Sequence, residues 1–373
     1  MKRILIITSS NTGSGHKSIS DSLTEQFARM PDVEVKAIDG FGLMGKPGLR
    51  SEGVYGFLTR HARAVYNLSW DLTMAHPPKF AMMARLCRRR FTEEIRVFRP
   101  DLILSVHSLF NHVLTRMLGS LGLDIPVVVL QADLINIHST WCNPGAFRTI
   151  CPTREAYDCS VSQGMTPDKL DILSFPTRGR FCDEAGRAGV REYDASRPLH
   201  CLMMSGGEGS GNIRAYAEAI LESTDAELTI ICGRNKKLYG KLQKELYGKY
   251  GGRVNVLGFV NDVEREMLRS DLMITRSSPN SMLEAVVMNV PLVITGSPLR
   301  QERDNPRIMQ ERGFGVVCSS PSEIHTVIDS LLDNGGARLG EISAAQRSGR
   351  SFDSARDIAV YVTRLCEPLA YTV

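Results

Sequence analysis

Two glycine-rich turns carry the clearest chemistry in this chain. The first, SNTGSGH at Ser10–His16, follows the apolar run Ile4–Ile7. The second, Ser205–Gly211, follows Leu199–Met204 and precedes a helical pattern over Ile213–Glu222. Glycine lets a backbone approach a phosphate closely, and a helix N-terminus presents unpaired N–H groups and a positive dipole end. The spacing therefore predicts two nucleotide-type folds that face one another across a cleft.

Short apolar runs alternate with helical patterns in both halves, which predicts parallel sheets covered by helices. In the first half we expect strands at Ile4–Thr8, Val33–Ile38, Leu102–Val106 and Val127–Gln131, with helices at His16–Arg29 and Leu109–Leu118. In the second half we expect strands at Leu199–Met204, Leu228–Cys232, Val254–Leu257, Leu272–Thr275, Leu292–Thr295 and Gly315–Cys318. Intervening helices are expected at Ile213–Glu222, Lys236–Lys249, Val263–Arg269, Ser281–Val287 and Pro306–Arg312, with two more near Ser322–Leu332 and Ser354–Leu365. Ligands of such sheets bind beyond the carboxyl ends of the strands, where both glycine turns lie.

A length of 373 residues favours two domains, because one core rarely grows that large. The polar stretch Arg187–Pro198 is the expected linker, so the predicted domains are residues 1–190 and 191–373, with the last helix free to pack back on the first domain. No apolar run approaches the ~20 residues that span a bilayer, and the chain enters its first strand at once, so we expect a cytoplasmic protein. The nine cysteines form no C-x-x-C pair, which favours reduced, buried thiols over zinc ligands.

The region from Met44 to Arg99 combines basic charge with an apolar stripe. It holds eleven Lys and Arg against four Asp and Glu, in a chain whose net charge is only +4. One face of a helical pattern carries apolar residues and the opposite face carries polar ones. The apolar positions are Val54, Phe57, Leu58, Val65, Leu68 and Leu72, with Tyr55, Tyr66 and Trp70 as rings suited to a headgroup boundary. Together with Arg88, Arg89 and Arg90, this composition predicts a segment that lies on an anionic membrane surface; the alternative is a core helix with a solvated basic face.

At four places the chain resembles the monogalactosyldiacylglycerol synthases and the processive diacylglycerol glucosyltransferases, two-domain enzymes of GT-B architecture. These places are TGSGH at Thr12–His16; ADL at Ala132–Leu134 with HSTW at His138–Trp141; GGEG at Gly206–Gly209 with CGRNKK at Cys232–Lys237; and LEA at Leu283–Ala285 with Gln301, Glu302 and Asn305. The likeness runs in consistent order from about Met1 to about Val317. It implies two Rossmann-like domains and a UDP-sugar donor.

The resemblance implies that the second domain holds the donor. Main-chain N–H groups of the glycine turn would bind the diphosphate, and Glu284 would accept hydrogen bonds from the ribose hydroxyls. Phe259 would lie at the uracil, unless it is a core aromatic residue. The full expected donor set is Gly206, Gly207, Glu208, Gly209, Ser210, Gly211, Phe259, Asn280, Ser281, Glu284, Gln301, Glu302 and Asn305. No metal-ligand pattern is present, so neither a metal ion nor another cofactor is expected.

The acceptor side is expected in the first domain. By the resemblance, His16 is either the general base, since imidazole titrates in the right range, or a group that steers donor and acceptor, and Asp133 is a second candidate base. His138 and Trp141 lie just beyond Asp133 and are expected to contact the acceptor or the membrane, together with Phe57, Leu58, Tyr66, Trp70 and the three arginines Arg88–Arg90.

The sequence thus predicts an inverting transfer of glucose or galactose from a UDP-sugar to diacylglycerol, at the inner face of the cell membrane. An undecaprenyl-linked or other lipophilic acceptor is an alternative. A UDP-N-acetylglucosamine 2-epimerase-like isomerase is another, although such an enzyme needs no membrane-directed segment. A nucleic-acid module is disfavoured, because no recognised binding motif surrounds the basic residues.

Overall fold

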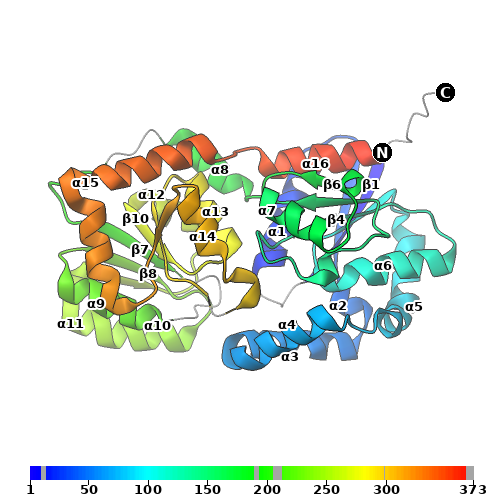
Figure 1. Cartoon of the computed structure of the whole chain (residues 1–373), viewed down its shortest axis with the longest axis horizontal. Coiled ribbons are helices and arrows are strands. Elements are labelled where there is room, and N and C mark those ends of the chain that lie inside the picture. The colour runs from blue at the N-terminus through cyan, green and yellow to red at the C-terminus, as the bar shows by residue number, and fades with distance from the viewer. Residues whose placement is uncertain (10–13, 189–192, 205–211, 298, 367–373) are drawn as a thin grey trace. The chain divides into compact units, whose positions relative to one another are not determined.

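A computed structural model describes residues 1–9, 14–188, 193–204, 212–297 and 299–366. The chain divides into two compact units, each described here by itself (Figure 1). Unit 1 comprises Met1–Gly179, Leu299–Gln301 and Asp353–Val373, and unit 2 comprises Arg180–Pro298 and Glu302–Phe352. The division therefore falls at Gly179–Arg180, ahead of the expected linker, and the last helix, α16 (Ser354–Leu365), groups with unit 1, where it packs on α1 (Ser14–Ala28).

The described part of unit 1 is built on one parallel sheet of six strands in the order β2-β1-β3-β4-β5-β6. The strands are β1 (Lys2–Thr8), β2 (Val33–Asp39), β3 (Leu102–Ser105), β4 (Val127–Leu130), β5 (Arg148–Cys151) and β6 (Leu170–Ile172). The remaining helices of this unit are α2 (Gly40–Leu43), α3 (Lys46–His61), α4 (Arg63–Ala75), α5 (Phe80–Phe98), α6 (Ser108–Leu121), the short η1 (Ser139–Trp141), α7 (Arg154–Ser162) and η2 (Pro167–Lys169). Strands β1, β3 and β4 are apolar and almost fully buried, because helices cover both faces of a parallel sheet.

Unit 2 repeats the plan with six described strands in the order β12-β11-β10-β7-β8-β9. These are β7 (His200–Met204), β8 (Glu227–Ile231), β9 (Val254–Leu257), β10 (Leu272–Thr275), β11 (Leu292–Ile294) and β12 (Gly315–Val317). Its helices are α8 (Gly179–Arg187), α9 (Ile213–Ser223), α10 (Lys236–Leu242), α11 (Gly248–Tyr250), α12 (Val263–Arg269), α13 (Pro279–Val287), α14 (Asn305–Glu311) and α15 (Ile324–Gly349), with one-turn helices η3 (Gln243–Tyr247), η4 (Gly251–Arg253), η5 (Arg300–Glu302, which spans the division between the units) and η6 (Pro321–Glu323). Two predicted doubly wound α/β folds are confirmed.

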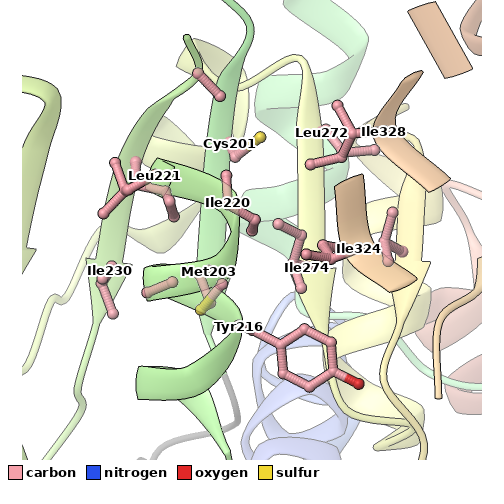
Figure 2. Packing of buried hydrophobic residues seen from close by; sticks show 14 of the residues in the cluster. Cys201, Met203, Tyr216, Ile220, Leu221, Ile230, Leu272, Ile274, Ile324 and Ile328 are labelled. Atoms are coloured by element: carbon pink, nitrogen blue, oxygen red, sulfur yellow. The ribbon is translucent and has the colours of Figure 1, made fainter. Parts of the chain in front are cut away.

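The core of unit 2 forms between α9, α15 and the strands beneath them. Figure 2 shows Tyr216, Ile220 and Leu221 of α9 over strand residues such as Met203 and Ile274, with Ile324 and Ile328 of α15 alongside. The side chains of α9 that face the sheet recur three or four residues apart, as an amphipathic helix requires. In unit 2 this packing supports the sheet at whose carboxyl edge the candidate donor-site residues lie.

Within the described residues, no helix is both long enough and apolar enough to cross a bilayer.

Candidate functional site

His16 lies at the switch point of the first sheet. Strands β1 and β3 are neighbours, and the chain leaves β1 toward β2 on the other side, so their carboxyl ends form the crevice where ligands of such sheets bind. In the first turns of α1, Nδ1 of His16 lies 2.7 Å from the carbonyl oxygen of Val106, the residue that follows β3. A carbonyl can only accept, so Nδ1 carries the proton and Nε2 retains its lone pair. This is the tautomer that a general base needs.

The surroundings keep the His16 ring uncharged. Burial lowers the pKa of His16 to about 4, and the bond to Val106 offsets only part of that effect. The residue still keeps partial solvent exposure. A neutral, partly accessible imidazole can take a proton from a bound hydroxyl group. Because the imidazole is a weak base, it accepts the proton only as the hydroxyl oxygen forms its new bond and becomes acidic.

The carboxylate of Asp133 is held by a hydrogen bond from the Trp141 indole. Asp133 follows β4 on the same edge of the sheet, and its Oδ2 accepts from Nε1 of Trp141 at 2.7 Å. Trp141 is 2% exposed, and its ring centroid lies 6.2 Å from that of His16. The loop folds the indole of Trp141 into the unit, away from a membrane surface, and its expected contact with the acceptor stays a prediction. The three residues form one cluster.

His138 is also buried, at 5% exposed, and its expected contact with the acceptor stays a prediction. Its Nδ1 accepts the N–H of Thr140 at 3.1 Å, which leaves the proton on Nε2. Nε2 then donates to Thr73 Oγ1 at 3.0 Å, and the Trp70 ring lies 4.5 Å away in an edge-to-face contact. His138 thus joins α4 to the segment that carries Trp141.

Tyr66 also faces inward. It is 5% exposed, its ring packs edge-on against Tyr55 of α3 at 5.5 Å, and its hydroxyl lies 3.2 Å from Oε1 of Gln301, a residue of unit 1. Its predicted place at a lipid headgroup boundary is wrong, because α3 packs against α4 and the ring is buried.

The opposite face of α3 and α4 is apolar and open to solvent. Phe57, Val65, Leu68 and Leu72 are each more than half exposed, and Leu58 is partly exposed. The alternative of a core helix with a solvated basic face is therefore wrong for this stripe. On α5 one face is buried, whereas the side chains of Arg88, Arg89 and Arg90 are exposed. An apolar stripe beside arginines is the composition of a membrane-surface segment.

His107, which the sequence pattern did not single out, lies beside His16. Its ring centroid is 4.4 Å from that of His16, and the residue is 3% exposed. The signal was present, because His107 comes directly after the apolar run Leu102–Val106, at the carboxyl edge of the predicted sheet.

The predicted phosphate turn of unit 2 lies outside the described residues, and with it Gly206, Gly207, Glu208, Gly209, Ser210 and Gly211. Its flanks are described: β7 ends at Met204, and α9 begins at Ile213. Strands β10 and β8 border β7 on its two sides, so the turn connects two elements at the switch point of the second sheet.

Residues after β10 and β11 meet at the same edge. Asn280, Ser281 and Glu284 lie on α13, which begins with Pro279, a favoured first residue of a helix. Glu284 is 4% exposed. The side chain of Asn305 donates to the Ser277 carbonyl at 2.8 Å, and Glu302 pairs with Arg276 at 3.3 Å. These bonds join the loops that follow the two strands.

At this edge, the buried Oδ1 of Asn305 and Oγ1 of Thr275 make no hydrogen bond to another described residue. Buried polar atoms are normally paired with protein, water or a ligand. Phe259, which follows β9, is 54% exposed with the guanidinium of Arg234 over its ring at 4.9 Å. The core alternative for Phe259 is therefore wrong.

Comparisons with known proteins identify the two halves. Residues 16–176 match the family model for monogalactosyldiacylglycerol synthase, and residues 212–334 match that for glycosyl transferases group 1. The chain is 29% identical to the chloroplastic monogalactosyldiacylglycerol synthase of Spinacia oleracea, over 96% of this chain and 71% of that protein. It is also 29% identical to monogalactosyldiacylglycerol synthase 1 of Arabidopsis thaliana, over 88% of this chain and 64% of that protein.

Solved structures agree in fold at low sequence identity. MurG of Acinetobacter baumannii matches with a TM-score of 0.64 at 12% identity, over 98% of this chain and 100% of that one. The glycotransferase of kitacinnamycin matches with 0.66 at 14%, over 98% and 99%. A MnaA–UDP co-structure from S. aureus matches with 0.65 at 14%, over 98% and 97%. The GT-B fold and the predicted resemblance are confirmed.

Proposed function

We propose that this chain, which matches the family models for monogalactosyldiacylglycerol synthase and for glycosyl transferases group 1, transfers glucose or galactose from a UDP-sugar to diacylglycerol. The observation that carries this proposal is the pairing, within unit 1, of a neutral imidazole at the carboxyl edge with an exposed apolar stripe beside arginines. The first feature suits a hydroxyl acceptor, and the second suits an acceptor that is dissolved in a membrane.

In the proposed reaction, the free hydroxyl oxygen of diacylglycerol attacks C1 of the sugar while the bond from C1 to the diphosphate oxygen breaks. Nε2 of His16 takes the hydroxyl proton, and UDP departs with the bonding electron pair. Attack from the face opposite the leaving group inverts C1 and gives the β-anomer. Asp133, held by Trp141, would orient the acceptor or share the positive charge that develops on His16.

In unit 2 we propose that the glycine turn binds the diphosphate and that Glu284 binds the ribose hydroxyls. The orphan Oδ1 of Asn305 would accept from a sugar hydroxyl, and the ring of Phe259 would lie along the base. Main-chain N–H groups would offset the charge of the leaving group without a resident metal ion or other cofactor. Full activity after EDTA treatment would support this part of the proposal. A loss of activity after EDTA treatment that added Mg²⁺ reverses would refute it.

We propose that the protein lies peripherally on an anionic leaflet at the inner face of the cell membrane. The exposed stripe of α3 and α4 would enter the headgroup boundary, and Arg88–Arg90 would contact lipid phosphates, each adding ~1 kcal/mol.

A donor and acceptor panel tests the function. UDP release from UDP-glucose and UDP-galactose is measured with anionic vesicles that contain or lack diacylglycerol. Release that requires diacylglycerol supports the proposal. Release that requires an undecaprenyl-linked lipid instead would identify the alternative acceptor. An epimerised UDP-N-acetylglucosamine formed without any acceptor would identify an isomerase.

A further inference from the structure

The candidate base has a neighbour that the proposed reaction does not use. His107 is 3% exposed, and its ring lies against that of His16 with the centroids 4.4 Å apart and the planes tilted by 41°. Placing an imidazole almost wholly out of water is unfavourable unless its nitrogens find partners. A buried histidine in contact with a candidate base therefore requires an explanation.

Two phenylalanines fix the position of the His107 ring. Phe41 of α2 meets it edge-on at 5.4 Å, Phe110 of α6 lies at 5.5 Å, and the two phenylalanines meet each other at 5.2 Å. The chain keeps room for this cage at Gly40, where a Cβ atom would lie 2.4 Å from the Phe110 ring. The cage leaves His107 little freedom to rotate.

A hydrogen bond fixes the proton of His107. The residue is the N-cap of α6, and its Nδ1 accepts the N–H of Leu109 at 3.3 Å. Nδ1 is therefore unprotonated, and the single proton resides on Nε2. Burial lowers the pKa of His107 well below its usual value, and a charge on His16 lowers it further. His107 is consequently neutral whenever His16 is protonated.

We propose that His107 is a positioning residue for His16: its ring packs against the ring of His16 and excludes water from that side. Contact with the His107 ring keeps Nδ1 of His16 bonded to the Val106 carbonyl, so that Nε2 remains the ring atom that accepts a proton. This inference rests on the proposed role of His16 as the base.

The ionisable groups around His16 come from several elements. His107 lies at the start of α6, Asp133 lies behind the Trp141 ring, and Lys17 is the next residue of α1, where it pairs with Asp21 at 2.7 Å. At the end of β1, Ser9 donates to the buried carboxylate of Glu52 in α3. A test must leave these groups unchanged and alter only the ring at position 107.

Two variants separate the two properties of His107, its ring and its N-cap acceptor. His107→Phe keeps a flat ring against His16 but loses the N-cap acceptor, whereas His107→Asn keeps a good N-cap acceptor but loses the ring. If the ring is what excludes water, only the Asn variant hydrates His16. The pKa of His16 in that variant then rises from about 4 toward the ordinary value of 6.5.

The direct measurement is a titration of the His16 Cε1–H signal by NMR in the full chain, with His16→Gln used to assign the signal. We expect His107→Asn to move the His16 midpoint upward by about one pH unit or more, and His107→Phe to leave it near the wild-type position. A His107→Asn midpoint at the wild-type position would overturn the proposal, as would an equal upward movement in both variants. No sugar donor or lipid is needed, so this result stands whether or not the proposed transfer occurs.

Kinetics give a second readout. We expect His107→Asn to lower kcat by roughly 10- to 100-fold with the donor KM unchanged, because only the alignment of the base is lost. His107→Phe should lower kcat less than His107→Asn and should lower Tm through the lost cap. The reverse order of kcat in two variants that remain folded would contradict the positioning role.

Discussion

The indole nitrogen of Trp141 donates to a carboxylate oxygen of Asp133 across 2.7 Å. The bond joins η1 to the residues that follow β4, and the same indole lies 6.2 Å from the His16 ring. One buried aromatic residue therefore borders both candidate proton-transfer groups of unit 1.

Trp141→Phe should lower kcat by roughly 10- to 100-fold, because a hydrogen bond to a charged group is worth about 1.5–3 kcal/mol and phenylalanine has no donor. Steady-state kinetics of Trp141→Phe, Asp133→Asn and the double variant would check this. The double variant should be little worse than Asp133→Asn alone, since both changes break the same bond. Strictly additive losses would show that Trp141 acts independently of Asp133.

His16 should make folding stability fall in weak acid. Its pKa is about 4 in the folded chain, mainly because of burial, and near 6.5 in the unfolded chain. The unfolded chain therefore binds the proton more readily, so the stability that neutral His16 contributes is complete above pH 6.5 and is lost as the pH falls from 6.5 toward 4. Urea unfolding at pH 7 and pH 4.5 measures the loss. His16→Gln should lose less stability than the wild type over that interval, and an equal loss in both proteins would contradict the assignment.

Leu68→Glu on α4 should weaken binding to anionic vesicles by about 10-fold or more, because an exposed leucine that enters the membrane contributes roughly 1.5–3 kcal/mol. Leu68 is 59% exposed, so folding should be unaffected. Val161→Glu on α7 is the matched control, since Val161 is also exposed but lies outside α3, α4 and α5. Vesicle sedimentation gives both affinities. Equal binding by Leu68→Glu and the wild type would remove the stripe from the membrane contact.

Glu284→Gln should weaken UDP binding by about 10-fold or more, because a carboxylate that accepts from two ribose hydroxyls is replaced by a neutral amide. The substitution keeps the shape of a side chain that is 4% exposed. Glu311→Gln is the control on α14, where Glu311 pairs at the surface with Arg307. Calorimetry supplies the dissociation constants, and identical values for Glu284→Gln and Glu311→Gln would refute the ribose assignment.

Burial explains which elements could be predicted. Strands β9 and β10 have the predicted bounds, because the apolar residues of each are bordered by charged or glycine residues. Strands β5 and β6 were missed, since Arg148 and Asp171 interrupt their apolar pattern and pairing with neighbouring strands defines them. The predicted helix Lys236–Lys249 is interrupted by a π-helical stretch at Gln243–Tyr247.

Side-chain direction explains the errors in the site. An amphipathic stripe and the residues at strand ends can be recognised from spacing, which is why His16, Asp133 and the leucines of the stripe could be named as candidates. Tyr66 was expected at a membrane surface, because sequence gives its aromatic character but not which side chains cover it. Its burial depends on packing against Tyr55 of the preceding helix α3. The burial of His138 depends on contact with Thr73 of α4, which lies far from it in the chain.

The central claim is that this chain makes a hexosyl diacylglycerol. The most direct measurement is mass spectrometry and NMR of the lipid extracted after incubation with isotope-labelled UDP-glucose or UDP-galactose and diacylglycerol in anionic vesicles. We predict a labelled β-hexosyl diacylglycerol with the wild type and none with His16→Gln. If the wild type forms no labelled glycolipid from either donor, or forms an α-linked one, the account is contradicted.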